Sequence, residues 1–136
     1  HPDDVFFLEV YKGSGTKTAM LFDADNMVSP DPESLRDLVD GETITLAGEE
    51  FTLKHAPGHS PGCTLIVGKE YCFSGDVLFK GSIGRTDFEW SDADAMNESL
   101  RTAVLPLDDA LQILPGHGPT TTMRAERTGN PFLLAL

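Results

Sequence analysis

The chain has 136 residues, of which 40% are hydrophobic, and its 22 acidic against 10 basic residues give a net charge of −12 at pH 7. This length fits one domain, residues 1–136, built around a single buried core. The acidic balance argues against nucleic acids and anionic membranes as partners, because both bind basic surfaces. No stretch approaches the roughly 20 consecutive apolar residues that a membrane-spanning helix needs.

The N-terminus and the cysteines bear on processing and compartment. The chain starts at His1 with an acidic stretch and has no initiator methionine. We therefore expect a processed chain or a fragment, without a signal peptide. Cys63 and Cys72 form no C-x-x-C pair and are too few for a disulfide scaffold. We expect both to be buried free thiols in strands of a cytoplasmic protein.

The first third of the chain gives weak local signals. Residues 5–11 are apolar but do not distinguish a short helix from a strand. The Gly-Ser-Gly at residues 13–15 predicts a turn, and it lacks the Gly-Lys-Ser/Thr ending of a phosphate-binding loop. Asp31 followed by Pro32 predicts the start of a helix that Gly41 ends.

Short strands dominate the middle of the chain. Residues 43–46 and 51–55 both alternate between apolar and polar positions. Gly48 lies in the turn between them, which predicts a hairpin. Residues 64–67 and 71–73 predict two further strands.

Two helices are predicted in the last third of the chain. Residues 91–104 begin with Ser91 as the N-cap and have Asp94 three residues later, as in a capping box. Residues 121–128 predict a second helix, which Gly129 ends. The apolar positions of the first helix form one stripe that we expect to be buried: Met96, Leu100, Ala103 and Val104.

Three predicted strands end in the same way. After each strand, a glycine lets the backbone turn sharply, and a side chain that can bind a metal follows. If the strands share a sheet and run in the same direction, the three side chains meet at one edge. The strands are residues 51–56, 71–73 and 111–114, and the side chains that follow them are His59, Asp76 and His117.

The three side chains suit a metal centre. Neutral imidazole binds zinc and iron well, and a carboxylate can bridge two cations. Two cations about 3.5–4 Å apart can hold a hydroxide and polarise a carbonyl. Each residue by itself is more often an ordinary loop residue, so the prediction depends on the threefold repetition of the context.

Four motifs follow one another along the chain: residues 56–62 (Ala-Pro-Gly-His-Ser-Pro-Gly), 74–76 (Ser-Gly-Asp), 84–87 (Gly-Arg-Thr-Asp) and 114–119 (Leu-Pro-Gly-His-Gly-Pro). In this order they resemble the later motifs of metallo-β-lactamase-fold hydrolases. Residues 121–127 and 130–132 are similar to the ending of the small glyoxalase II-like branch. The resemblance covers nearly the whole chain.

The resemblance implies an α/β fold, a four-layer αββα sandwich, of which this chain supplies the second half. It implies two zinc ions in the complete site, with iron or manganese as alternatives. His59 would bind the first metal, His117 the second, and Asp76 would bridge both as the central catalytic residue. Arg85 and Asp87 match a family motif beside the site. We expect them to pair and brace the loop, because a permanently charged guanidinium is a poor proton carrier.

The family's earlier His-x-His-x-Asp-His motif, which supplies two ligands to each metal, has no counterpart in this chain. His1 does not begin such a spacing, and His55 is expected on the core face of its strand with Phe51 and Leu53. The first β-sheet and its helix are therefore missing from the predicted fold. We expect the isolated chain to bind metal weakly, to be inactive, and to self-associate through an exposed sheet face.

The function that the resemblance implies is metal-dependent hydrolysis of a small-molecule thioester of the hydroxyacylglutathione type. A thiolate leaves easily, so the reaction requires no separate general acid. Two other enzymes remain open, a persulfide dioxygenase-like protein with one iron and a lactonase. A non-catalytic interaction module with a vestigial site is the third alternative. Metal content, oxygen uptake and the sequence upstream of His1 would distinguish them.

Overall fold

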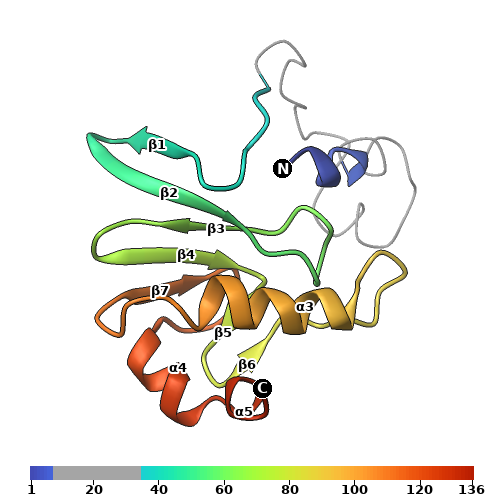
Figure 1. Cartoon of the computed structure of the whole chain (residues 1–136), viewed down its shortest axis with the longest axis vertical. Coiled ribbons are helices and arrows are strands. Elements are labelled where there is room, and N and C mark those ends of the chain that lie inside the picture. The colour runs from blue at the N-terminus through green and yellow to red at the C-terminus, as the bar shows by residue number, and fades with distance from the viewer. Residues whose placement is uncertain (8–34) are drawn as a thin grey trace.

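The computed structural model describes residues 1–7 and 35–136 (Figure 1). Most of the ambiguous segment 5–11, the predicted turn at 13–15 and the helix start predicted at Asp31 lie outside the described residues. Residues 35–40 are described and are not helical, so the predicted helix does not reach Gly41.

A six-stranded mixed sheet forms the centre of the fold, in the order β1-β2-β3-β4-β7-β8. Only β4 and β7 pair in parallel; the other neighbours are antiparallel. It follows that β2, β4 and β7 run in the same direction, so the loops that follow these three strands begin at the same edge of the sheet. The strands are β1 (Thr43–Leu46), β2 (Glu49–His55), β3 (Thr64–Val67), β4 (Tyr71–Gly75), β7 (Gln112–Pro115) and β8 (Thr121–Thr122).

The predicted hairpin between the first two strands is confirmed. Leu46 pairs with Glu49, so the connection is the two residues Ala47 and Gly48. Both have positive φ, 52° and 86°. Two-residue hairpin turns need this left-handed backbone because it matches the twist of the strands, and Gly48 adopts it without steric cost.

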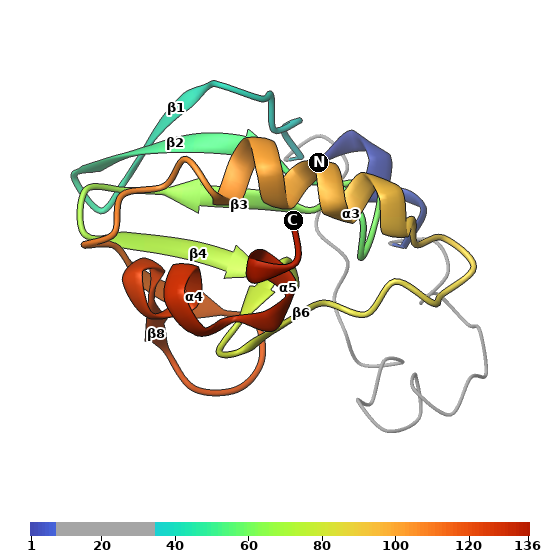
Figure 2. The ribbon, with the colours of Figure 1, turned by 60° about the horizontal axis from the view of Figure 1, so that its bottom comes forward.

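The helices lie on one face of the sheet, and Figure 2 shows them in front of the strands. Helix α3 (Ala93–Ser99) continues into the π-helical turn η4 (Leu100–Val104), and α4 (Met123–Gly129) and α5 (Pro131–Leu134) follow near the C-terminus. The remaining elements are the short helix η1 (Pro2–Asp4) and a small hairpin, β5 (Leu78–Phe79) and β6 (Ser82–Ile83). Among the described residues, none of these helices has the length and hydrophobicity to cross a membrane.

The predicted starts of the last two helices need correction. Asp92, and not Ser91, caps α3, because its carboxylate accepts from the backbone of Asp94 and Ala95, both at 2.9 Å. The Ser91 hydroxyl instead donates to a loop carbonyl described below. Helix α4 starts at Met123 rather than at residue 121, because the two threonines before it pair with β7 as β8.

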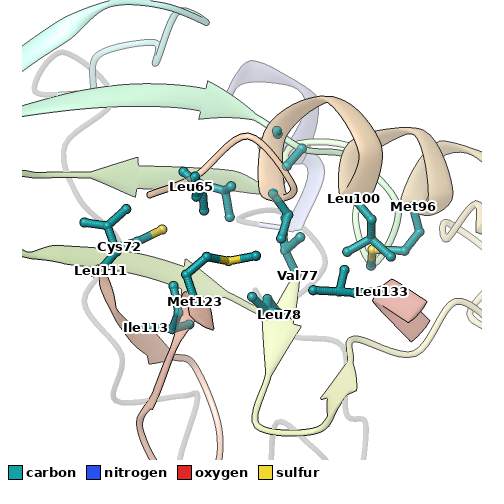
Figure 3. Close-up of a cluster of buried hydrophobic side chains, with 14 residues drawn as sticks. Leu65, Cys72, Val77, Leu78, Met96, Leu100, Leu111, Ile113, Met123 and Leu133 are labelled. Carbon is teal, nitrogen blue, oxygen red and sulfur yellow. The ribbon is translucent and has the colours of Figure 1, made fainter. Parts of the chain in front are cut away.

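The core lies between the sheet and the helices, as the buried side chains in Figure 3 show. The predicted stripe of the helix 91–104 is fully part of it, with Met96, Leu100 and Val104 at 0% exposure. Leucine or methionine side chains buried in this way contribute about 1.5–3 kcal/mol each. From the sheet and the C-terminal helices, this core receives Leu65, Cys72, Ile113, Met123 and Leu133.

The opposite face of the sheet carries exposed aromatic side chains. Strand β4 alternates strictly, so that Cys72 and Ser74 point into the core while Tyr71 and Phe73 remain 41% and 42% exposed. The α/β class is confirmed, as a main sheet with the helices of residues 35–136 on one side. This arrangement is that of a truncated α/β sandwich.

Two smaller predictions need correction. His55 is only half-buried, and its ring stacks on the ring of His1 with centroids 4.0 Å apart instead of packing into the core. Phe51 and Leu53 on the same strand are buried as predicted. Cys72 is a buried thiol, but Cys63 is half-buried and lies just before β3.

Candidate metal centre

The three predicted ligands lie together at the ends of β2, β4 and β7. His59 Nε2 is 3.4 Å from Asp76 Oδ2, and His117 Nδ1 is 2.8 Å from Asp76 Oδ1. The carboxylate therefore directs one oxygen toward each histidine. This placement follows from the parallel direction of the three strands and the short turn after each of them.

Glycines allow the two histidine loops to approach their neighbours closely. A Cβ on Gly58, which has φ +148°, would lie 2.5 Å from the backbone of Met96 on α3. A Cβ on Gly116 would lie 2.5 Å from Asp76 Oδ1 itself. Any larger residue at these positions would displace the helix or the carboxylate, so glycine is required by the close approach.

A backbone carbonyl orients His59. Its Nδ1 is 2.9 Å from the carbonyl oxygen of Arg85, which can only accept a hydrogen bond. Nδ1 therefore carries a proton, and Nε2 faces Asp76. Metal-binding histidines are typically held by such a hydrogen bond on their other nitrogen.

The loop that carries His59 is tied down by three further hydrogen bonds. The Asp4 carboxylate accepts from the Ser60 hydroxyl and from the Gly62 backbone, both at 2.7 Å. The Ser91 hydroxyl donates to the His59 carbonyl, also at 2.7 Å. Sequence reasoning did not single out Asp4, because no local pattern links it to a loop more than 50 residues away.

His117 is held less firmly. Its side chain is 77% exposed, against 21% for His59 and 24% for Asp76. Its contacts in the described structure are the Asp76 carboxylate and the edge of the Phe79 ring, with ring centroids 6.1 Å apart. The centre therefore has one fixed histidine and one histidine at the surface.

The predicted pairing of Arg85 with Asp87 is confirmed. Two parallel hydrogen bonds of 2.6 and 2.7 Å join the guanidinium to the carboxylate. The hydrogen bond from Arg85 lowers the pKa of Asp87, and the same bond raises the pKa of Arg85. The guanidinium also lies 4.2 Å above the centre of the Phe88 ring. Both partners are largely exposed, so the brace lies at the rim of the site.

A cavity of about 740 Å³ opens onto the three predicted ligands. We call it the aromatic hollow, because besides His59, Asp76 and His117 its wall includes four aromatic side chains. Two serines, Ile83, Gly84 and Arg85 complete the wall. The aromatic residues are Phe7, Phe79, Phe88 and Trp90.

The cysteines do not offer a nucleophile to this cavity. Burial raises the pKa of the Cys63 thiol, which lies 3.1 Å from the Ser60 hydroxyl, and raises the pKa of Cys72 to about 12. A thiol is a weak nucleophile unless it is deprotonated. The chemistry of the site therefore belongs to the histidines and the carboxylate.

The donor set fits part of a two-metal site. Within the described ranges, the ligand atoms of His59, Asp76 and His117 do not form one group with all distances below 4.8 Å. Two imidazoles that face different oxygens of one carboxylate instead match two cations bridged by that carboxylate.

Comparisons with known proteins find similar sequences. The sequence model of the Metallo-beta-lactamase superfamily matches residues 2–117. A hydroxyacylglutathione hydrolase, GloC, of Haemophilus influenzae is 46% identical over 96 residues, which are 69% of this chain and 45% of that protein. An uncharacterised protein of Mycobacterium tuberculosis is 36% identical over 145 residues, covering all of this chain and 64% of that protein.

A solved structure has the same fold. It is a crystal structure of TTHA1623 in a di-iron-bound form, with a TM-score of 0.73 and 37% identity, and the match covers 98% of this chain and 63% of that one. The chain therefore spans between about half and two thirds of the length of the relatives that it matches.

Proposed function

The chain belongs to the metallo-beta-lactamase superfamily, and from this premise we propose that it forms part of a metal-dependent thioester hydrolase of the hydroxyacylglutathione type. The observation that carries the proposal is the Asp76 carboxylate, with one oxygen toward His59 and the other toward His117. The 46% identity to the Haemophilus hydroxyacylglutathione hydrolase supports a thioester as the substrate.

The three ligands have different roles in this proposal. His59 and Asp76 would hold one metal, and His117 and Asp76 would hold the other. Zinc suits these imidazole and carboxylate donors, and iron is the alternative because the neighbour TTHA1623 was crystallised in a di-iron-bound form. When bound, the metals would supply Lewis acidity toward water and toward the substrate carbonyl.

The remaining residues act on orientation rather than on bond breaking. The Arg85 carbonyl fixes the His59 ring, and Asp4 fixes the loop below it. A thiolate leaving group needs no proton from the protein. The proposed hydrolysis therefore uses no general acid and no covalent nucleophile from this chain.

The test uses the longest form of the protein that contains these residues. Metal content and hydrolysis of lactoylglutathione, a lactone and glutathione persulfide are measured in parallel. We expect about two metals per chain and turnover of the thioester in preference to the lactone. If the protein instead holds one iron and takes up oxygen when given the persulfide, the proposed hydrolase is wrong and the protein is a dioxygenase. A protein that binds no metal and turns over none of the three would be an interaction module.

These 136 residues by themselves should be a poor enzyme. They supply three ligands, and Tyr71 and Phe73 of β4 are 41% and 42% exposed on the face of the sheet away from the helices. We propose that this face drives self-association, because exposed apolar surfaces of a sheet tend to associate with one another. Analytical ultracentrifugation should show dimers or larger species. Phe73→Lys should shift them toward monomer, and Phe132→Lys, which changes another exposed phenylalanine, is the control that should not. A monomer that tightly binds two metals would contradict this expectation.

A further inference from the structure

Glu126 is a buried carboxylate that the proposed hydrolysis does not use. It lies on α4 and is 3% exposed. Its oxygens accept three hydrogen bonds, from the Thr121 hydroxyl at 2.7 Å, the Gly81 backbone at 2.8 Å and the Asn130 side-chain amide at 2.9 Å. Hydrogen bonds to a buried carboxylate are strong because little water competes for its oxygens, so they fix the positions of their donors.

Thr121 ends the loop that carries His117. This loop joins β7 to β8, and Thr121 is the first residue of β8. The loop starts where the Gly116 backbone donates to the Gly75 carbonyl at 2.8 Å. Its other end is held by the pairing of β8 with β7 and by the hydrogen bond from the Thr121 hydroxyl to Glu126. Loss of that hydrogen bond should therefore loosen the loop at its C-terminal end.

Gly81 lies in the hairpin that places Phe79 beside His117. The hairpin of β5 and β6 turns at Lys80 and Gly81, and Phe79 meets His117 edge to face with ring centroids 6.1 Å apart. The side-chain amide of Asn130, which is fully buried, donates to carbonyls on both strands of this hairpin, at 3.0 and 3.4 Å. The same buried carboxylate thus anchors both the loop of His117 and the aromatic side chain against which this histidine lies.

The other two ligands are held independently of Glu126. A backbone carbonyl orients the His59 ring, and three further hydrogen bonds hold its loop. Asp76 follows β4, and the hydroxyl of the buried Ser74 fixes the chain on its other side by donating to a carbonyl of β5 at 2.8 Å. His117, in contrast, is 77% exposed. A change at Glu126 should therefore act on His117 more than on His59 or Asp76.

We infer that Glu126 is a positioning residue for His117 and that it sets the affinity of the metal on the His117 side of the centre. This role rests on the proposed two-metal site but not on the identity of the substrate. Glu126 does not line the cavity. It acts by keeping the loop of His117 and the ring of Phe79 in place. Residues that orient metal ligands in this way typically change metal affinity by about 10–100-fold.

The first test needs no metal. In the longest form of the protein that contains these residues, nuclear magnetic resonance after metal removal should show a nuclear Overhauser contact between the rings of Phe79 and His117. His117→Gln identifies the histidine signals. Glu126→Ala should remove the contact. Glu126→Gln should keep it, because its amide oxygen can accept the two N–H hydrogen bonds while its NH₂ group donates to the Thr121 hydroxyl. An unchanged contact in Glu126→Ala would overturn the inference.

The second test measures the two metals separately. Competitive titration of the same protein with a chelating dye gives the two affinities, and His117→Ala shows which of them depends on His117. Glu126→Ala should weaken that affinity about 10–100-fold and leave the other near that of the parent. Glu126→Gln should leave both near those of the parent.

Arg127→Met is the matched control on the same helix. The Arg127 guanidinium bonds to residues 105–109, none of which lines the cavity. Both Glu126→Ala and Arg127→Met should lower the melting temperature, but only Glu126→Ala should weaken the metal on the His117 side. Equal weakening of this metal in both variants, or equal weakening of both metals in Glu126→Ala, would overturn the inference and leave Glu126 a role in the fold alone.

A milder variant decides if Glu126→Ala does not fold. Thr121→Val keeps the shape of the side chain and removes only the hydrogen bond at the loop of His117. It should weaken the metal on the His117 side and leave the other, and an unchanged affinity would overturn the inference.

Failure of the proposed function gives a different result. A parent that binds no metal would overturn the metal centre, and the ring contact would still decide whether Glu126 positions His117. Two metals and thioester hydrolysis in the parent, with an unchanged metal on the His117 side in Glu126→Ala, would overturn the inference and leave the hydrolase intact.

Discussion

The described residues bring together two groups of His, Asp and His, and the two groups differ in how well their geometry suits a metal. The first, His59, Asp76 and His117, lies at the ends of three strands that run in the same direction. The second, His1, Asp3 and His55, lies where the first turn of the chain meets the end of β2. Its ligand atoms all lie within 4.8 Å of one another, closer than in the first group.

The difference lies in where the lone pairs point. The rings of His1 and His55 are parallel within 7° and stacked 4.0 Å apart, so their in-plane lone pairs do not converge on one point. His55 Nε2, the nitrogen that lies nearest Asp3, is also 2.7 Å from the Pro61 carbonyl, which requires this same nitrogen to carry a proton. In the first group, the Arg85 carbonyl takes the proton-bearing nitrogen of His59 and leaves the other free toward Asp76. Proximity alone therefore does not identify a metal site; the direction of the histidine nitrogens, set for His59 by its second hydrogen bond, also matters.

The largest expected effect comes from removing the shared carboxylate of the first group. In the longest form of the protein, Asp76→Ala should lower bound metal from about two per chain to near zero and hydrolysis by a thousandfold or more, on the order of several kcal/mol of transition-state stabilisation. His59→Ala or His117→Ala should leave about one metal. Asp3→Ala is the control, and metal analysis by mass spectrometry is the measurement. An Asp76→Ala protein with the full metal content would refute the bridging role.

A smaller effect should follow from loosening the loop below His59. Asp4→Ala removes two hydrogen bonds of 2.7 Å to Ser60 and Gly62. We expect metal affinity to fall about 10–100-fold, as for other residues that orient metal ligands. Competitive titration with a chelating dye measures it. Asp4→Asn keeps one acceptor oxygen and should restore part of the metal affinity. If Asp4→Ala binds metal as tightly as the parent, the hydrogen bonds of Asp4 do not support the metal centre.

The Arg85–Asp87 pair should contribute less, because both side chains are largely exposed. Arg85→Lys keeps the charge and loses the planar fork, so the melting temperature should fall slightly. The pKa of Asp87 is lowered in the folded state, so the pair stabilises the protein above the ordinary carboxyl value of 3.8 and loses this contribution as the pH falls through the lowered pKa.

Thermal melts of the parent and Asp87→Asn at pH 7 and pH 3 measure this contribution. The small difference between them should be present at pH 7 and shrink at pH 3. Unchanged melting of Arg85→Lys together with lost activity would instead make Arg85 a substrate-binding residue.

The smallest effect is expected in the second His-Asp-His group. His55→Gln can still donate to the Pro61 carbonyl, so both stability and metal content should stay near those of the parent. His55→Ala should cost about 1 kcal/mol of unfolding free energy through the lost hydrogen bond, again without a change in metal content. Denaturant unfolding and metal analysis test both. Loss of metal in His55→Gln would show that the stacked pair is a metal site after all.

Local pattern was sufficient where the physical cause is local. The Ala47-Gly48 turn, the alternation of the strands and the buried stripe of the helix 91–104 follow from backbone freedom and periodicity within a few residues. The three glycine turns also predicted that His59, Asp76 and His117 would meet, because strands that run in the same direction end at one edge. The pairing of Arg85 with Asp87 was expected from the resemblance of residues 84–87 to a family motif.

Only the tertiary structure decided the contacts that join distant segments. Ser91 is a good N-cap by pattern, yet its hydroxyl is used by the His59 carbonyl and Asp92 takes its place. Residue 121 starts a strand instead of a helix because β7 offers it a partner. Asp4 reaches a loop more than 50 residues away, and His55 stacks on His1 rather than on the core. In each case, a polar or aromatic group has several satisfactory partners, and the sequence near it does not say which one the fold brings within reach.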